Sequence, residues 1–294
     1  MARFGRIVTA MVTPFDTKGN VDFEKTTLLI EYLLKNGTDS LVITGTTGES
    51  PTLTKQEKLA LYDHVVKVVD KRVPVIAGTG NYNTKESIEL TKEAEKIGVD
   101  GILLVAPYYN KPSQEGLYQH FRAIAMETEL PIMIYNIPGR SVIEIAPETV
   151  IRLSQIPNIV AVKDAGGDLD KMTQIIANTA DDFELYVGDD SLTLPAMSIG
   201  AVGVVSVASH VIGKEMQAMI NSYLAGDVQK AAKWHQHLLP LMKQLFAQPS
   251  PAPVKTALQL KGIHVGTVRL PLVPLNAEER EELRRVLNNV NQEV

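Results

Sequence analysis

One lysine lies inside an otherwise apolar segment, where a charged side chain is unusual. Lys163 belongs to the run IVAVKDA, whose small and β-branched residues are typical of a buried strand. Alternation along that strand places Lys163 on the same face as Ile159 and two alanines, which leave room beside it. Burial lowers a lysine's pKa, and a neutral amine attacks a carbonyl carbon. Lys163 is therefore a candidate Schiff-base residue, although an ion pair with Asp164 would also explain it.

Five further polar residues follow other apolar runs, and each has a chemical and a purely structural interpretation. Tyr135 suits the proton transfers of imine formation, or it is a core residue with its hydroxyl at the rim. Thr46 and Thr47, in the run GTTGE, offer hydroxyls and N–H groups that suit a carboxylate, or they form a simple tight turn. Arg140 could bind a carboxylate bidentately or remain a solvated loop residue. Tyr109, in the pair YY, could equally belong to an interface.

The sequence gives little support for a metal site. The six histidines are scattered, and His235 and His237 are two residues apart on a predicted helix, so they face different ways. Asp189 and Asp190 could bind a cation, but no other ligands cluster with them, and capping a helix at Ser191 is a plainer role. We therefore expect no metal ion.

Short apolar runs recur along the chain, and they would form the strands that position these residues. They predict eight buried parallel strands over Ile7–Phe15, Ser40–Gly45, Pro74–Gly80, Gly101–Pro107, Pro131–Pro138, Ile159–Ala165, Glu184–Asp189 and Gly203–Ser209. Amphipathic segments between them predict helices over Asp22–Lys35, Thr54–Asp70, Thr84–Lys96, Gln114–Thr128, Pro147–Gln155, Asp168–Asn178 and Ser191–Ile199. Thr54 with Glu57 three residues later predicts a capping box, and Gly98 predicts a helix end.

This alternation predicts an α/β fold, a closed (β/α)8 TIM barrel, in which an active site lies at the carboxyl ends of the strands. An open doubly wound sheet is the alternative, but the first strand carries no glycine-rich dinucleotide fingerprint. After Ser209 only helices are expected, over Gly213–Leu224, Val228–Phe246, Val254–Lys261 and Ala277–Asn289. We therefore divide the chain into a catalytic barrel, residues 1–224, and a C-terminal helical extension, residues 225–294.

Composition narrows the class of protein. The 294 residues include no cysteine, which excludes disulfides, zinc–thiolate sites, iron–sulfur clusters and a cysteine nucleophile. The formal net charge of −5 argues against nucleic-acid binding. No apolar run is long enough to span a bilayer, and no signal peptide is visible, so we expect no membrane association and a cytoplasmic location. An enzyme or a small-molecule binder fits these properties.

Four runs in this order and at these spacings carry a family resemblance. They are GTTGE (45–49), PYY (107–109), YNIPGR (135–140) and VKD (162–164). Together they resemble the dihydrodipicolinate synthase (4-hydroxy-tetrahydrodipicolinate synthase) family, which belongs to the N-acetylneuraminate lyase-like class I aldolases. The resemblance covers essentially the whole chain, including Pro251–Lys261 near its end.

The resemblance implies a role for each candidate residue. Lys163 would form a Schiff base with pyruvate, and Tyr135 would donate and accept protons. Thr46 would link Tyr135 to Tyr109 of a neighbouring subunit in a proton relay. The expected assembly is a homotetramer, a dimer of tight dimers. No metal or organic cofactor is implied.

The same resemblance assigns the substrate contacts. Thr47 would hold the pyruvate carboxylate, and main-chain groups of Gly188 and Val205 would line the pyruvate pocket. Arg140 would orient the second substrate, L-aspartate 4-semialdehyde. The implied reaction is the condensation of these two substrates to 4-hydroxy-tetrahydrodipicolinate, the committed step of diaminopimelate and L-lysine biosynthesis.

Two sister activities are alternatives, and one departure from the family bears on regulation. N-acetylneuraminate lyase and 2-keto-3-deoxy sugar-acid aldolases share the lysine and the tyrosine, but they generally lack an arginine at the position of Arg140. A barrel that binds a metabolite without catalysis is disfavoured by Lys163. Lysine-inhibited family members usually carry histidines where this chain has Lys55 and Lys58. Because cations there should repel bound lysine, we expect weak or absent feedback inhibition, even with Tyr108 and Glu86 available to the same cleft.

Overall fold

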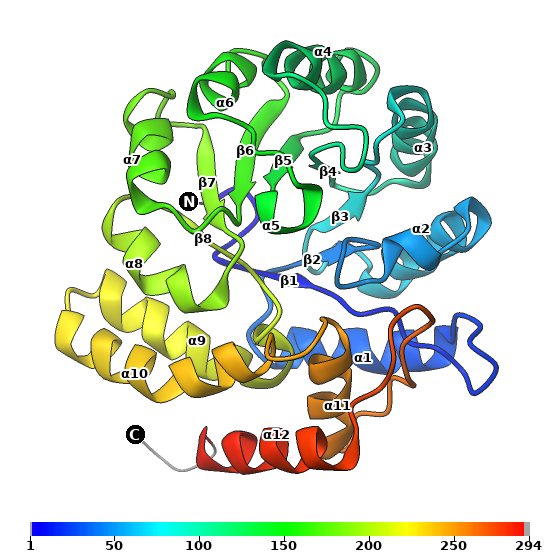
Figure 1. Ribbon diagram of the computed structural model, residues 1–294, viewed down its shortest axis with the longest axis vertical. Coiled ribbons are helices and arrows are strands. Elements are labelled where there is room, and N and C mark those ends of the chain that lie inside the picture. The colour runs from blue at the N-terminus through cyan, green and yellow to red at the C-terminus, as the bar shows by residue number, and fades with distance from the viewer. Residues whose placement is uncertain (1, 291–294) are drawn as a thin grey trace.

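The computed structural model describes residues 2–290 and contains a closed barrel of parallel strands (Figure 1). Each strand pairs with the next one in the chain, and the last pairs with the first. The strands are β1 (Ile7–Ala10), β2 (Ser40–Ile43), β3 (Val75–Gly78), β4 (Gly101–Val105), β5 (Ile132–Asn136), β6 (Ile159–Asp164), β7 (Glu184–Val187) and β8 (Gly203–Ser206). The predicted TIM barrel is confirmed, and the open sheet is wrong because the described strands leave no sheet edge.

Helices surround this barrel and cover the outer face of its strands (Figure 1). They are α1 (Phe23–Lys35), α2 (Lys55–Val69), α3 (Thr84–Ile97), α4 (Gln114–Ala125), α6 (Pro147–Leu153), α7 (Leu169–Ala177), α8 (Thr193–Ser198) and α9 (Ser209–Leu224). Three short helical turns lie in loops after strands: η1 (Ser50–Thr52), α5 (Pro138–Ser141) and η2 (Asp190–Leu192). None of the helices within residues 2–290 combines the length and the apolarity needed to cross a membrane.

Three C-terminal helices follow the barrel, as predicted: α10 (Val228–Gln244), α11 (Ala252–Leu260) and α12 (Ala277–Val290). They pack on α9 and on one another, and Figure 1 shows them together at the lower edge of the barrel. The buried side chains of α12, Leu283, Leu287 and Val290, face the shared core. These helices therefore belong to the same hydrophobic core as the outer layer of the barrel.

Local sequence signals explain where several helices begin and end. The predicted capping box is confirmed at α2, where Thr54 accepts from the N–H of Glu57 and the Glu57 carboxylate accepts from the N–H of Thr54. Gly98 ends α3 with a φ of +96°, a conformation that a glycine adopts without strain. Asn83 begins α3 by accepting from two N–H groups of its first turn.

Two groups of apolar side chains follow from the alternation of the strands. One fills the inside of the barrel and includes Val8, Val42, Ile76, Leu103, Met133, Tyr135, Tyr186 and Val205. The other lies between the strands and the helices. The prediction that Ile159 shares a face with Lys163 is wrong: Ile159 packs in the outer group, whereas Val160 and Ala161 pack inside. The cause is a shift of register between β5 and β6 beside Ile132, which changes the alternation.

Candidate active site

Lys163 lies on β6 inside the barrel, and its side chain is 6% exposed. Its neighbours in register are Tyr135 on β5 and Tyr186 on β7. Burial lowers the pKa of Lys163 to about 7; the negative charge of Asp190 opposes this effect, and the positive charge of Arg140 adds to it. A substantial fraction of this amine is therefore neutral near neutral pH and able to attack a carbonyl carbon.

The alternative explanation of Lys163, an ion pair with Asp164, is wrong. Lys163 has no carboxylate within ion-pair distance among the described residues. The Asp164 carboxylate instead accepts from the side-chain amide of Asn136 at 2.8 Å and from the N–H of Gly166 at 2.9 Å. The adjacent residues of β6 therefore face different surroundings, as alternation along a strand requires.

Tyr135 lies opposite Lys163 on the neighbouring strand. The lysine Nζ lies 4.0 Å from the centroid of the tyrosine ring. Burial raises the pKa of Tyr135 well above its ordinary value, while the Arg140 charge and a hydrogen bond with Thr46 act in the opposite direction. The phenol consequently keeps its proton near neutral pH, and it can donate that proton to an atom bonded to the lysine nitrogen.

A cavity of about 230 Å³ opens at the carboxyl ends of β2 to β5. Its wall consists of Thr44, Gly45, Thr46, Ser50, Pro51, Gly78, Gly80, Leu103, Val105, Tyr108, Tyr135, Ile137, Arg140 and Ser141. Thr46, Tyr135 and Arg140 are thus the predicted residues that line it. Lys163 lies beside the wall, in contact with the Tyr135 ring. The position matches the expected location of a site in this type of barrel.

The turn after β2 is tightly built. The N–H of Glu49 donates to the carbonyl of Thr46 at 3.0 Å, and the hydroxyl of Thr13 donates to the carbonyl of Gly48 at 2.7 Å. A Cβ atom at Gly48 would lie 3.1 Å from the backbone of Thr44, so a larger residue would push the turn away from the strand. Thr47, inside this turn, is buried. The turn therefore presents its threonines from a fixed backbone.

Arg140 is exposed at the mouth of the cavity on α5. The short helix α5 was not predicted, because four residues are too few to show a periodic pattern. The side chain of Asn136, at the end of β5, holds the loop beyond α5 by accepting from the N–H of Ile145 at 3.0 Å. The guanidinium is thus carried by a loop that is anchored at both ends.

Gly188 and Val205 lie close to the lysine from two other strands. A Cβ atom at Gly188 would lie 3.0 Å from Cε of Lys163 and 2.7 Å from Cβ of Ala165. Any larger residue would therefore displace the amine. Val205 on β8 is buried in the same interior group as Tyr135.

Tyr109 is the one predicted catalytic residue that lies apart from the cavity within this chain. Its side chain is 90% exposed, and its φ of +71° is rare for a residue other than glycine. The adjacent Tyr108 lines the cavity and packs edge-on against Tyr82, with ring centroids 5.1 Å apart.

Asp190 is a site neighbour that sequence reasoning did not identify. Its carboxylate is fully buried and accepts from the hydroxyl of Ser206 at 2.5 Å and from the N–H groups of Val207 and Ala208. Burial raises its pKa to about 6. The neighbouring Asp189 takes the predicted capping role at Ser191. Nothing in the pair DD distinguishes the buried Asp190 from the half-buried Asp189.

The arrangement can capture a keto acid. It combines a buried amine, a phenol in contact with it, a rigid turn with hydroxyl groups and an arginine at the entrance. Within residues 2–290 no group of three or more histidine, aspartate and glutamate side chains gathers in a way that could hold a metal ion.

Comparisons with known proteins agree with this geometry. The model of the dihydrodipicolinate synthetase family matches residues 3–290. The chain is 64% identical to the 4-hydroxy-tetrahydrodipicolinate synthase of Bacillus velezensis, over 97% of this chain and 99% of that protein.

Solved structures give the same result. The dihydrodipicolinate synthase DapA-2 from Bacillus anthracis is 64% identical with a TM-score of 0.97, covering 98% of this chain and 99% of that one. The enzyme from Cyanidioschyzon merolae, solved with lysine bound, is 46% identical with a TM-score of 0.96, covering 98% of each chain. The chain therefore belongs to the dihydrodipicolinate synthase family.

Proposed function

We propose that this protein is a lyase of the class I aldolase type that condenses pyruvate with L-aspartate 4-semialdehyde to form 4-hydroxy-tetrahydrodipicolinate. This reaction is the committed step of diaminopimelate and L-lysine biosynthesis. The single observation that carries the proposal is the buried amine of Lys163, whose pKa falls to about 7 and which contacts Tyr135, a residue of the cavity wall. Family membership indicates the substrates, and the contact between Lys163 and Tyr135 supports a Schiff-base mechanism.

The first half of the reaction builds a nucleophile. The Lys163 amine attacks the keto carbon of pyruvate, and the adduct loses water to give a protonated imine. The Tyr135 phenol delivers a proton to the departing oxygen and recovers it through Thr46, which hydrogen-bonds with it. Loss of a proton from the methyl carbon then gives an enamine, because the protonated imine accepts the electron pair.

The second half joins the two substrates. The enamine carbon attacks the aldehyde carbon of the semialdehyde, and its oxygen takes up a proton. The amino group of the adduct then attacks the imine carbon, closes the ring and releases Lys163 as a free amine. Arg140, at the cavity mouth, binds the carboxylate of the incoming aldehyde. Thr47 holds the carboxylate of pyruvate, while Gly188 and Val205 shape the pocket around the imine.

A complete relay requires a second subunit, and we propose at least a tight dimer and, by family resemblance, a homotetramer. Tyr109 is 90% exposed and held with a positive φ, which suits a side chain that reaches into a neighbouring subunit's site. Light scattering of wild type and Tyr109→Ala tests this assembly. A monomeric wild type with full activity would contradict it. We also propose a cytoplasmic location, where pyruvate is available.

A coupled assay tests the reaction against its nearest rival. Wild-type enzyme is supplied with pyruvate and either L-aspartate 4-semialdehyde or N-acetylmannosamine, the aldehyde of the N-acetylneuraminate lyase reaction. The positive charge of Arg140 at the entrance favours the substrate that carries a carboxylate. We expect turnover with the semialdehyde, and preferential turnover of N-acetylmannosamine would contradict the proposal.

A further inference from the structure

A buried group of charges joins the turn after β2 to the C-terminal helices. Nζ of Lys255, on α11, lies 2.7 Å from Oε1 of Glu49, and their side chains are 3% and 1% exposed. The lysine also donates to the carbonyl of Thr267 at 2.8 Å. The second oxygen of Glu49 accepts from the N–H of Arg269 at 2.9 Å. Both carboxylate oxygens of Glu49 are therefore held by the C-terminal part of the chain.

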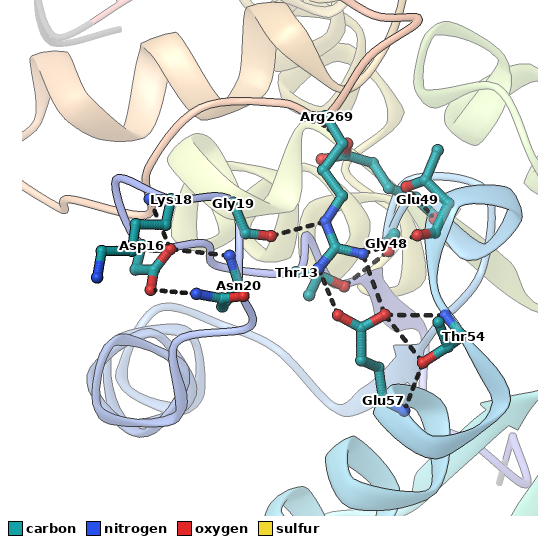
Figure 2. A network of polar contacts seen from close by, with 11 residues as sticks. Thr13, Asp16, Lys18, Gly19, Asn20, Gly48, Glu49, Thr54, Glu57 and Arg269 are labelled. Atoms are coloured by element: carbon teal, nitrogen blue, oxygen red, sulfur yellow. Dashed lines mark hydrogen bonds and ion pairs between the residues drawn. The ribbon is translucent and has the colours of Figure 1, made fainter.

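Arg269 continues this connection toward the start of α2. Figure 2 shows its guanidinium between the loop that contains Gly19 and the carboxylate of Glu57. It donates to the carbonyl of Gly19 at 2.8 Å and to the carbonyl of Thr52 at 2.7 Å, and it forms a bidentate ion pair with Glu57. The two ends of η1 are thus fixed by one segment of the chain.

Phe15 provides a common surface for the two cations. The Lys255 nitrogen lies 4.2 Å from the centroid of its ring, and the Arg269 guanidinium carbon lies 4.4 Å from it. The N–H of Phe15 donates to the carbonyl of Val265, and a Cβ atom at Gly266 would lie only 2.1 Å from the Phe15 carbonyl oxygen. The C-terminal segment is therefore packed directly against the loop that follows the first barrel strand.

The turn that this group holds is the one that carries Thr46 and Thr47. Glu49 ends the turn with a φ of +57°, and Thr44 begins it with a φ of +51°. Residues other than glycine persist in this left-handed region only where their surroundings fix them. Glu49 is under such a constraint, because both oxygens of its own carboxylate are held by the C-terminal part of the chain.

Stability alone does not account for the pair. Buried ion pairs lose much of their attraction to desolvation, and apolar residues of similar size often support a fold equally well. Removing only one partner leaves a charge that the interior cannot solvate. A buried pair does, however, allow few alternative positions for the backbone that carries it, and here that backbone is the substrate-binding turn.

We propose that Lys255 and Arg269 are positioning residues for pyruvate, which hold the threonine turn in place through Glu49 without touching the substrate. This inference rests on the proposed function, because it assigns the turn to the pyruvate carboxylate. The C-terminal part of the chain then contributes indirectly to the affinity of the barrel for its first substrate.

The test measures KM for both substrates in the variants Lys255→Met and Glu49→Gln, and in the double variant with both substitutions. Each single substitution should raise KM for pyruvate about tenfold or more, and KM for the aldehyde by less than about threefold. The double variant should recover thermal stability, because it contains no unpaired buried charge, yet keep the raised KM for pyruvate. A double variant with the wild-type KM for pyruvate would overturn the proposal.

A control separates positioning from general loosening. Leu287→Ala removes a buried side chain of α12 that has no part in the charged group, so it should lower Tm without changing KM for pyruvate. An equal rise of KM in this control would also overturn the proposal. Failure of the wild-type enzyme to form any pyruvate adduct would instead reject the proposed function, so the two failures are distinguishable.

Discussion

Replacing Lys163 by methionine should stabilise the protein while abolishing its activity. The side chain is 6% exposed, and a fall of its pKa from 10.5 to about 7 means that folding disfavours the charged amine. Each pKa unit corresponds to about 1.4 kcal/mol, so the cost to the folded state is up to about 5 kcal/mol. Methionine has a similar shape and no charge, so we expect Lys163→Met to gain about 2 to 5 kcal/mol near neutral pH.

The pH dependence identifies the cause of this gain. Below the folded-state pKa of about 7 the amine is protonated in the folded protein and in the unfolded chain, so the full cost of burying its charge is present. Between about pH 7 and 10.5 the amine is neutral in the folded protein but still largely protonated in the unfolded chain. The cost therefore falls as the pH rises, and it disappears near pH 10.5, where the unfolded chain also loses its proton. The advantage of Lys163→Met should therefore shrink steadily across this range.

Urea unfolding at a fixed protein concentration measures the difference at several pH values between about 6 and 9. Lys67→Met is the matched control, since Lys67 lies on α2 with a side chain that is 71% exposed. It should change the free energy of unfolding by less than about 0.5 kcal/mol at every pH. A Lys163→Met protein no more stable than wild type near pH 7, or a gain that does not vary with pH, would refute the reasoning.

Three further results are expected. Tyr135→Phe should lower kcat by about a hundredfold or more, because the proton donor beside the amine is lost; near-normal initial rates would exclude the phenol from proton transfer. Arg140→Ala should raise KM for L-aspartate 4-semialdehyde about tenfold or more and leave KM for pyruvate nearly unchanged, as steady-state kinetics can show. L-Lysine at millimolar concentration should inhibit weakly or not at all, because Lys55 and Lys58 place two amines near its expected cleft; strong inhibition in the initial-rate assay would contradict this expectation.

The apolar pattern located all eight strands but extended each of them too far. The first strand was predicted to run to Phe15, yet β1 ends at Ala10. Val12 and Phe15 are buried, but they lie outside the strand ladder. Periodicity reports burial, whereas a strand ends where its backbone hydrogen bonds end, and the two boundaries differ in a barrel with well-packed loops.

The candidate site was predictable as far as it depends on strand ends. Lys163 and Tyr135 were expected near the carboxyl ends of their strands, and they are direct neighbours in register. Contacts between distant segments were not predictable. The bond between Glu49 and Arg269 joins residues 220 positions apart, and no local pattern specifies which loops meet. Only the packed C-terminal helices bring these residues together.

The most direct test of the account is to trap the imine. Wild-type enzyme is mixed with pyruvate, reduced with borohydride, digested and examined by peptide mass spectrometry. We predict one reduced pyruvate on Lys163 and none in the Lys163→Met variant. Lys255 is an internal comparison, because it is also buried and its pKa is lowered to about 8, but it is paired with Glu49 away from the cavity. An unmodified Lys163, or an adduct found on Lys255 instead, would contradict the account.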